Sequence, residues 1–348
     1  MTLARHTGAA ALVAIVLLVL SYRLSPFRDF QIAEVAAYVT AIAGLTYLIG
    51  LSGQVSIGHG AFMAIGAYVS ALIGLHLHWP LELIFAAATV SAAVAGGIVG
   101  VAAARLRGPY LAGATLMLAV ALPSLADRFS GLLGGDQGLS FTVTTPAFLG
   151  VTFPPTRWLA WIASAGALIT LVLLANLGHS RIGRNWRALR DNEVAAALSG
   201  LNVARMQILA FVVSSACAGL GGGLLAAVSA IVSPGAFTLA LSIGLITGAI
   251  LGGLGSLTGA VWGSIVIVFV PTYVQDVATS HGLSSAASSN VPIAAYGVVL
   301  IVVMLLFPAG IQGGLRRLLG PAAPAASAPF NALRRQAPAS EHQEEDTS

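Results

Sequence analysis

Residues Ser180–Ala210 read SRIGRNWRALRDNEVAAALSGLNVARMQILA, an arginine-rich and helix-prone stretch between two long apolar blocks. The stretch holds five of the chain's 16 basic residues, namely Arg181, Arg184, Arg187, Arg190 and Arg205. Arginines beside apolar spans mark a loop that stays on the cytoplasmic side of a membrane. We therefore predict a cytoplasmic loop at about 178–206, folded enough to bind a partner protein.

The composition is that of a protein embedded in lipid. Only 8% of the 348 residues are charged, 57% are hydrophobic, and the mean hydropathy is +0.91. A soluble domain has about a quarter of its residues charged. Lipid admits only helices or closed barrels, and unbroken apolar runs such as Leu83–Ala104 favour helices over alternating strands. We predict an all-α polytopic membrane protein.

Ten apolar segments come close to the roughly 20 residues that a helix needs to cross a bilayer. They are 9–22, 31–51, 60–77, 81–104, 109–127, 157–177, 207–231, 238–254, 258–276 and 292–308. The first resembles a signal peptide, but Ser21–Arg23 is not a small-residue cleavage site. We interpret it as an uncleaved span, with a removed signal as the alternative.

The distribution of arginine predicts the orientation. With both termini in the cytoplasm, 12 of the 16 arginines lie on that side. The reversed orientation inverts this ratio, against the positive-inside tendency. We expect a transmembrane domain at 1–320. The Pro-, Ala- and Ser-rich segment 321–348 is expected to be a disordered cytoplasmic tail, because it cannot bury enough apolar surface to fold.

The sequence offers little for enzyme chemistry. It contains no lysine, which excludes a Walker A loop and a Schiff-base enzyme. The histidines show no zinc-protease spacing, and no Ser-centred nucleophile elbow is present. We therefore expect no catalytic residues, no metal and no cofactor, and no nucleic-acid partner.

A glycine-rich segment, Gly50–Tyr68 (GLSGQVSIGHGAFMAIGAY), interrupts an apolar hairpin with polar residues. Irregular backbone at membrane depth is tolerated only where protein or a water-filled cavity covers it. One interpretation is a broken or re-entrant element that lines a translocation path. The other is a tight cytoplasmic turn whose glycines allow close helix packing. The path candidates are Gly53, Gln54, Ser56, His59 and Gly60.

Within the arginine-rich loop, an acidic cluster precedes a short alanine-rich helix. This cluster, Asp191, Asn192 and Glu193, can cap the start of that helix, and Gly200 can adopt the left-handed conformation at its end. Such a helix would project from the membrane surface. The alternative is an amphipathic helix lying on lipid phosphates.

Four blocks together resemble the inner-membrane permeases of branched-chain amino-acid ABC importers, LivM type. The blocks are GLSGQVSIGHGAFMAIGAY, RLRGPYLAGATLMLA, the loop SRIGRNWRALRDNEVAAALSGLNVARMQILAF, and LGGLGSLTGAVWGS followed by FPAGI. The resemblance covers roughly residues 35 to 315. It departs at Leu133–Gly138, in an external loop where the family often has a Thr-Gly-Gly-Ser-Asp/Asn-Gly stretch.

The resemblance implies a coupling helix seated in a cleft of an ATPase subunit. The family's Ala-Ala-x-x-x-Gly motif is matched by Ala195, Ala196 and Gly200, beside Arg187, Arg190, Asp191 and Glu193. It also implies a second related permease, two ATPase subunits and an extracytoplasmic substrate-binding protein, at the inner (plasma) membrane and surrounded by lipid.

The leading hypothesis is therefore the permease subunit of an ATP-driven importer for hydrophobic, branched-chain amino acids. Relatives of the family also import urea, short amides and small aromatic acids. From another class, a secondary transporter or channel would need paired intramembrane ionisable groups, and we find none in the sequence. An intramembrane enzyme has no visible catalytic constellation.

Overall fold

A computed structural model describes residues 2–105, 109–145, 147–148, 151–152, 154–281, 294, 297–298, 301–303, 305–307 and 310–319. The chain divides into two units, Met1–Gly314 and Leu315–Ser348, and the account below concerns the first. The expected tail at 321–348 lies outside the described residues.

The described residues confirm an all-α membrane protein. Seven helices are long and apolar enough to cross a membrane: α2 (Pro26–Ser52), α3 (His59–His76), α4 (Leu81–Ala103), α5 (Pro109–Arg128), α7 (Pro155–His179), α10 (Val203–Ser229) and α12 (Leu257–Ser280). Two further apolar helices, α1 (Thr2–Ser21) and α11 (Leu239–Gly252), also fall on predicted spans. The last predicted span, 292–308, lies mostly outside the described residues, so a count of ten stays a prediction.

The prediction at 238–254 needs a correction. The helix there, α11, has 14 residues and is about 21 Å long, which is shorter than the roughly 30 Å hydrocarbon core. It cannot cross a membrane alone. The residues before it form a short strand and a 3₁₀ turn instead of continuing the helix.

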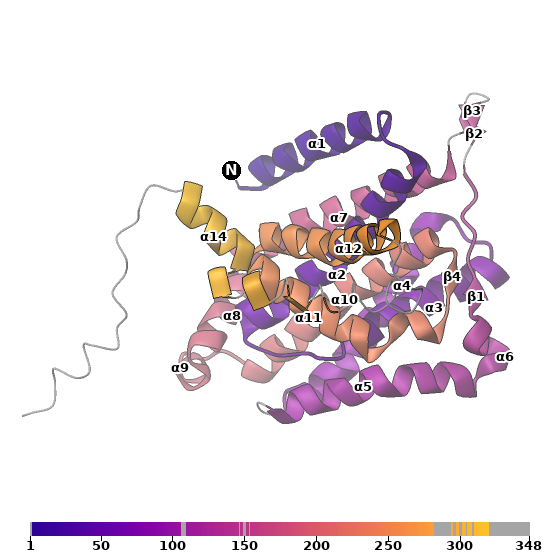
Figure 1. Ribbon diagram of the computed structural model, residues 1–348. Coiled ribbons are helices and arrows are strands. Elements are labelled where there is room, and N and C mark those ends of the chain that lie inside the picture. Colours follow the sequence, from indigo (N-terminus) through magenta and orange to yellow (C-terminus); the bar gives the residue numbers. More distant parts are fainter. Residues whose placement is uncertain are drawn as a thin grey trace, which may run out of the picture. The chain divides into compact units, whose positions relative to one another are not determined.

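Short elements occupy the two ends of the helices (Figure 1). One end carries α8 (Arg181–Asp191) and α9 (Glu193–Leu198), and α14 (Gly310–Leu319) follows later in the chain. The other end carries α6 (Ser130–Leu133), η1 (Gly135–Gln137), β1 (Leu139–Ser140), β2 (Ala147–Phe148), β3 (Val151–Thr152), β4 (Ile231–Val232) and η2 (Pro234–Phe237). Strands β1 and β4 pair antiparallel, with Leu139 opposite Val232, and β2 pairs antiparallel with β3.

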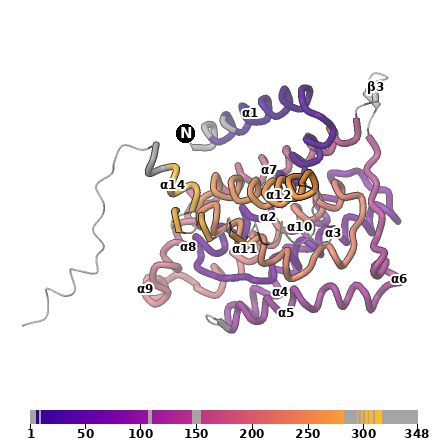
Figure 2. The backbone as a smooth tube through the Cα atoms, viewed as in Figure 1, coloured from indigo at the N-terminus to yellow at the C-terminus, as the bar shows by residue number. Residues whose placement is uncertain are grey.

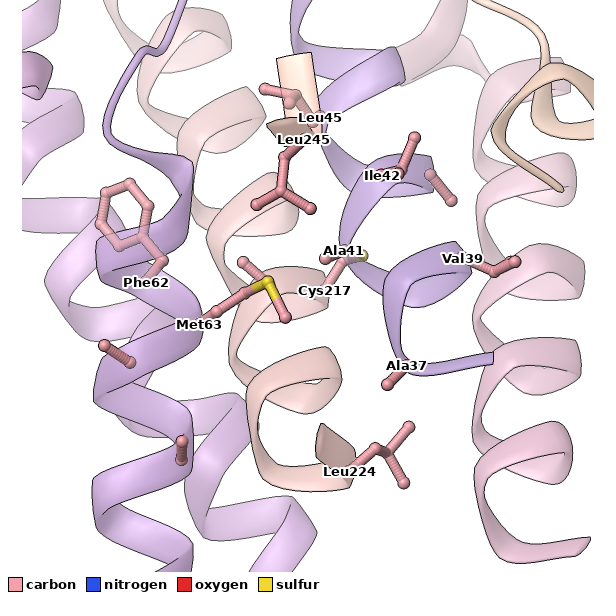
Figure 3. Packing of buried hydrophobic residues seen from close by; sticks show 14 of the residues in the cluster. Ala37, Val39, Ala41, Ile42, Leu45, Phe62, Met63, Cys217, Leu224 and Leu245 are labelled. Carbon is pink, nitrogen blue, oxygen red and sulfur yellow. The ribbon is translucent and has the colours of Figure 1, made fainter. Parts of the chain in front are cut away.

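Helix α10 packs against α2, α3 and α4 at the centre of this unit. Small residues allow the close approach: a methyl group added at Gly222 would collide with the carbonyl of Met63, and one at Gly66 with the carbonyl of Gly219. Such contacts matter in lipid, where apolar burial does not favour one helix neighbour over the membrane. Figure 3 shows Met63 of α3 and Cys217 of α10 next to Ala41 of α2 in this core.

Candidate functional site

The first break in the helical pattern follows α2. Gly53 adopts a left-handed conformation (φ 73°) at the C-cap, and residues 53–58 are not helical. The N–H groups of Gly53 and Gln54 still donate to carbonyls of the last turn, of Ile49 and Leu48. The chain then runs uncoiled from the end of α2 to the start of α3 (Figure 2).

This uncoiled segment, 53–58, leads back alongside α2. His59, the first residue of α3, places its Nε2 3.2 Å from the carbonyl oxygen of Ala41. Ala41 lies about 16 Å along α2 from its end at Ser52. Helix α3 therefore begins about half way across a hydrocarbon core of roughly 30 Å. This is the geometry of a re-entrant element and not of a tight turn at the surface.

A second break follows α10. The helix ends at Ser229, Ala230 takes a positive φ of 59°, and β4 and η2 lead to α11. Near the N-terminus of α11, the Ser242 hydroxyl oxygen accepts a hydrogen bond of 3.1 Å from the Gly60 N–H of α3. The starts of α3 and α11 thus meet inside the bundle.

The two helices run in opposite directions from this junction. Helix α3 leads toward the end that carries β1, and α3 contacts that strand. Helix α11 ends near Gly255, whose backbone abuts Gly50 in the last turns of α2. That is the end that carries α8 and α9, so the N-termini of both helices point to mid-membrane.

Helix α5 forms a further wall of the junction. The Ile57 N–H donates to the Thr115 hydroxyl at 3.0 Å, and a methyl group at Gly58 would collide with the carbonyl of Thr115. Segment 53–58 is therefore held against α5 by its backbone.

Several polar side chains of this region are buried, and some of their atoms lack a hydrogen-bond partner. Gln54, Ser56 and His59 are all buried, the last two completely. Within the described residues, Gln54 Oε1, Ser56 Oγ and His59 Nδ1 have no hydrogen-bond partner. Gln54 Nε2 donates to the Ser52 hydroxyl at 3.2 Å and to the Gln207 carbonyl at 3.4 Å. Buried polar atoms without partners need a structural explanation, such as a ligand or water that is bound there.

The arginine-rich loop folds as two short helices. Helix α8 is capped by Ser180, whose hydroxyl accepts from the Ile182 N–H, and its Trp186 is buried with Nε1 donating to the Met206 carbonyl at 2.9 Å. The start of α9 is capped by Asn192, whose Oδ1 accepts from the Ala195 N–H at 3.0 Å. The cap therefore comes from the predicted cluster 191–193, through its amide Asn192, while Asp191 ends α8.

The exposed part of this loop is unusually apolar. Val194 and Leu198 of α9 are 69% and 85% exposed, next to exposed Ala195, while Ala196 is buried. Gly200 follows with a φ of 87° and no atoms near its side-chain position, and α10 begins at Val203. Arg187 is exposed on α8, and Glu193 is half-buried at the start of α9.

Arg190 joins the loop to the first break. Its guanidinium donates to the carbonyl of Gly50 and, through Nε and the second terminal nitrogen, to Asp191 Oδ1 at 3.3 and 3.1 Å. Its aliphatic stem packs beside Gly53, where a methyl group would lie 3.0 Å from Cγ. A cavity of about 500 Å³ opens here between residues 52–55 and 189–193. The two predicted groups of site residues are thus in direct contact.

Two residues of the junction were missed from the sequence, Thr115 and Ser242. For Ser242, the sequence did contain a signal of a second break before α11. His59-Gly60-Ala61-Phe62 at the start of α3 has a counterpart, Pro234-Gly235-Ala236-Phe237, in η2 before α11. No group of three or more metal-ligating side chains occurs among the residues that the structure describes.

The chain is similar in sequence to known transport permeases. A family model described as branched-chain amino acid transport system, permease component, matches residues 29–308. The high-affinity branched-chain amino acid permease protein LivM of Escherichia coli K12 is 31% identical over 262 residues, which cover 69% of this chain and 61% of LivM. The chain thus spans about three fifths of the length of that relative.

More distant relatives match as well. The permease protein LivH of Salmonella typhimurium LT2 is 27% identical over 310 residues, 80% of this chain and 92% of LivH. The ribose import permease RbsC of Escherichia coli K12 is 27% identical over 242 residues, 65% of this chain and 71% of RbsC. No solved structure gives a significant match. The matched relatives are transport permeases and not enzymes, and the chain belongs to the family of permease components of branched-chain amino acid transport systems.

Proposed function

We propose that the chain is the membrane-spanning permease subunit of an ATP-binding-cassette importer for branched-chain amino acids. A binding protein delivers the substrate, and separate ATPase subunits supply the energy. The observation that carries this proposal is the contact of Arg190 with Gly50 and Gly53, because it joins an exposed two-helix loop to a break in the helices at the same end of the molecule.

The α8/α9 loop is the proposed docking surface for the ATPase. Val194 and Leu198 are too exposed for a surface that faces only water, and Arg187 and Asp191 surround them with charge of both signs. An apolar centre with a charged rim is typical of a protein interface. This end is then cytoplasmic, as the arginine distribution predicts, and both termini lie on that side.

The re-entrant segment is the proposed part of the translocation path. Gly53, Gln54, Ser56, His59 and Gly60 bring irregular backbone and polar atoms to a depth where lipid would tolerate neither. Movement of α8 and α9 reaches this segment directly through Arg190. ATP-driven closure of the ATPases would therefore open or close the path by pulling on the end of α2.

The relatives suggest the other partners. Both LivM and LivH are named as permease proteins of high-affinity branched-chain amino acid transport, and both resemble this chain. A second, related permease is the proposed partner in a heterodimer, in the inner (plasma) membrane. The end with β1 and β4 would face the binding protein.

The proposed substrate class is inferred from the relatives and not from the residues of the proposed translocation path. RbsC, named for ribose import, shows that permeases with similar sequences serve different substrates. Urea, short amides and small aromatic acids are the alternatives within the family. A secondary transporter is disfavoured, because the ion pair that the structure shows between α2 and α7, Asp29 with Arg157 at 3.7 Å, lies at the start of both helices and not at mid-membrane.

Substitution at Gly200 tests the coupling role. Gly200→Asp places a carboxylate and a strained left-handed residue at the end of the coupling helix, and nothing nearby obstructs its side chain. The full importer, co-expressed with its partner chains, should insert normally but lose leucine uptake. Gly131→Asp, at another open glycine near the β1 end, is the matched control. Normal uptake by Gly200→Asp would remove the coupling role.

A further inference from the structure

Two uncapped helix N-termini face each other inside the bundle. Helices α3 and α11 have 18 and 14 residues, and in neither does the N-cap residue's side chain accept a hydrogen bond from the first-turn N–H groups. The N-terminus of a helix carries free N–H groups and about half a unit of positive charge. The Gly60–Ser242 hydrogen bond of 3.1 Å brings these two ends together at mid-membrane.

Unpartnered polar atoms belong to the residues that lead into the N-terminus of α3. Ser56 and His59 are both 0% exposed, and Ser56 Oγ and His59 Nδ1 have no partner among the described residues. Side chains in the first turn of a helix lean back toward its start, so the His59 ring is carried toward the α3 N-terminus. A buried polar atom left without a partner costs roughly 1–3 kcal/mol. The junction therefore lacks a polar group that would complete it.

The hydrogen-bond donors and acceptors at the junction indicate which chemical groups the missing ligand would need. The Ala41 carbonyl can only accept, so the His59 Nε2 within 3.2 Å of it is the protonated nitrogen. In the neutral ring Nδ1 is then an acceptor that needs a donor. The Ser56 and Ser242 hydroxyls and the Gly60 N–H offer donors to an anion. Neither 54–62 nor 239–247 contains an arginine, so the helix ends are the positive groups of the junction.

We propose that this junction binds an α-amino acid in its zwitterionic form. The substrate carboxylate takes the Gly60 N–H and the Ser56 and Ser242 hydroxyls, and the substrate ammonium donates to His59 Nδ1. The proposal deepens the proposed function and rests on it. In this structure the Gly60–Ser242 bond closes the junction, so substrate enters when α3 and α11 separate. The apolar side chain then lies against the core around Met63 and Leu245 (Figure 3).

The first test places a fixed anion in the junction. Ser242→Asp supplies a carboxylate that competes with the substrate's, whereas Ser242→Asn has the same size without charge. In proteoliposomes that hold the full importer, Ser242→Asp should lower leucine uptake by at least about tenfold, the effect of roughly 1.4 kcal/mol. Ser242→Asn should stay within about threefold of wild type. Equal uptake by the two variants would overturn the proposal.

The second test does not depend on the folding of the aspartate variant. Cys217 is the only cysteine of the chain, so Ser56→Cys in a Cys217→Ala background gives one accessible thiol during turnover. We expect the anionic methanethiosulfonate reagent to react at least about tenfold faster than the cationic one, each rate normalised to a small free thiol. Leucine should slow this reaction, and leucinamide should not.

The outcomes separate this site from the function on which it rests. ATPase-dependent uptake by the wild-type importer supports the proposed function whatever the labelling shows. Equal normalised rates for the two reagents, or equal protection by leucine and leucinamide, would overturn the zwitterion site alone. Uptake by this chain without ATPase subunits would overturn the importer function itself.

Discussion

The two breaks in the helical pattern, 53–58 after α2 and 230–238 after α10, are built alike but held differently. Each follows a helix of 27 residues and leads to a shorter helix of 18 or 14 residues that starts inside the bundle. Gly-Ala-Phe occurs near both breaks, in the first turn of α3 and in η2, and both phenylalanines, Phe62 and Phe237, are buried. The directions are opposite, as in the inverted repeats of many transporters.

The difference lies in what anchors each break. Segment 53–58 is fixed by α5 through Thr115 and by the α8/α9 loop through Arg190. Segment 230–238 also contacts α5, through η2, and its β4 pairs with β1 at the opposite end. Besides α5, each break is thus tied to a different end of the bundle, the first to the α8/α9 end and the second to the β1 end. This arrangement would let an ATPase move α3 and a binding protein move α11, with the junction between them.

The largest effect is expected at a glycine, because the two breaks differ in the free space that a glycine side-chain position has. Gly58→Ala forces a methyl group into the carbonyl of Thr115, whereas the same substitution at a glycine of the second break, Gly235→Ala, meets no atom within 4 Å. Overpacking against backbone costs about 1–3 kcal/mol or more, so Gly58→Ala should lower the yield of folded protein and abolish uptake. Gly235→Ala should stay near wild type in both. Size-exclusion yield and uptake assays measure this, and similar losses in the two variants would contradict the asymmetry.

The second largest effect is expected at Arg190, because among the described residues only the first break is contacted by an arginine of the α8/α9 loop. Arg190→Met keeps the stem that packs on Gly53 but removes the hydrogen bond to Gly50. We expect uptake to fall about tenfold while ATP hydrolysis by the assembled importer continues. Arg184→Met, on the same helix, is the control, since Arg184 donates only to the nearby His179 carbonyl in the described contacts. A parallel loss of hydrolysis and uptake would indicate lost assembly and not lost coupling.

The sequence predicted the first break better than the second. Glycines and polar residues at 53–60 stand out in an apolar chain, and the arginine pattern indicated the loop that contacts them. The second break has few polar residues, so 238–254 passed for a complete span until α11 proved too short. The contact of Gly60 with Ser242 joins residues 182 positions apart, and local patterns carry no information on such pairing. The cap of α9 was predicted only as the cluster 191–193, because Asp, Asn and Glu are adjacent there and the sequence does not show which of them caps the helix.

The anchor of the second break should give a smaller effect. Gly138 has a φ of 71°, and a methyl group there would press on the backbone of Val232 in β4. Gly138→Ala should therefore loosen the β1–β4 pair, destabilise the protein by about 1–3 kcal/mol, and lower uptake driven by the binding protein. Basal ATP hydrolysis should not change, since the α8/α9 end is untouched. Gly131→Ala, at an open position, is the control, and a change in basal hydrolysis would contradict separate control of the two ends.

The smallest effect compares one threonine from each break. The Thr115 hydroxyl accepts the Ile57 N–H at 3.0 Å, whereas the Thr238 side chain makes no capping bond at the start of α11 and is exposed. Thr115→Val has nearly the same shape but leaves a buried N–H without its acceptor, at a cost of about 1–2 kcal/mol. In detergent, Thr115→Val should unfold at a lower temperature than the wild type. Thr238→Val should unfold at the wild-type temperature. Equal unfolding temperatures would mean that segment 53–58 is held by packing on α5 alone, and that its backbone is free to lose this bond when the path opens.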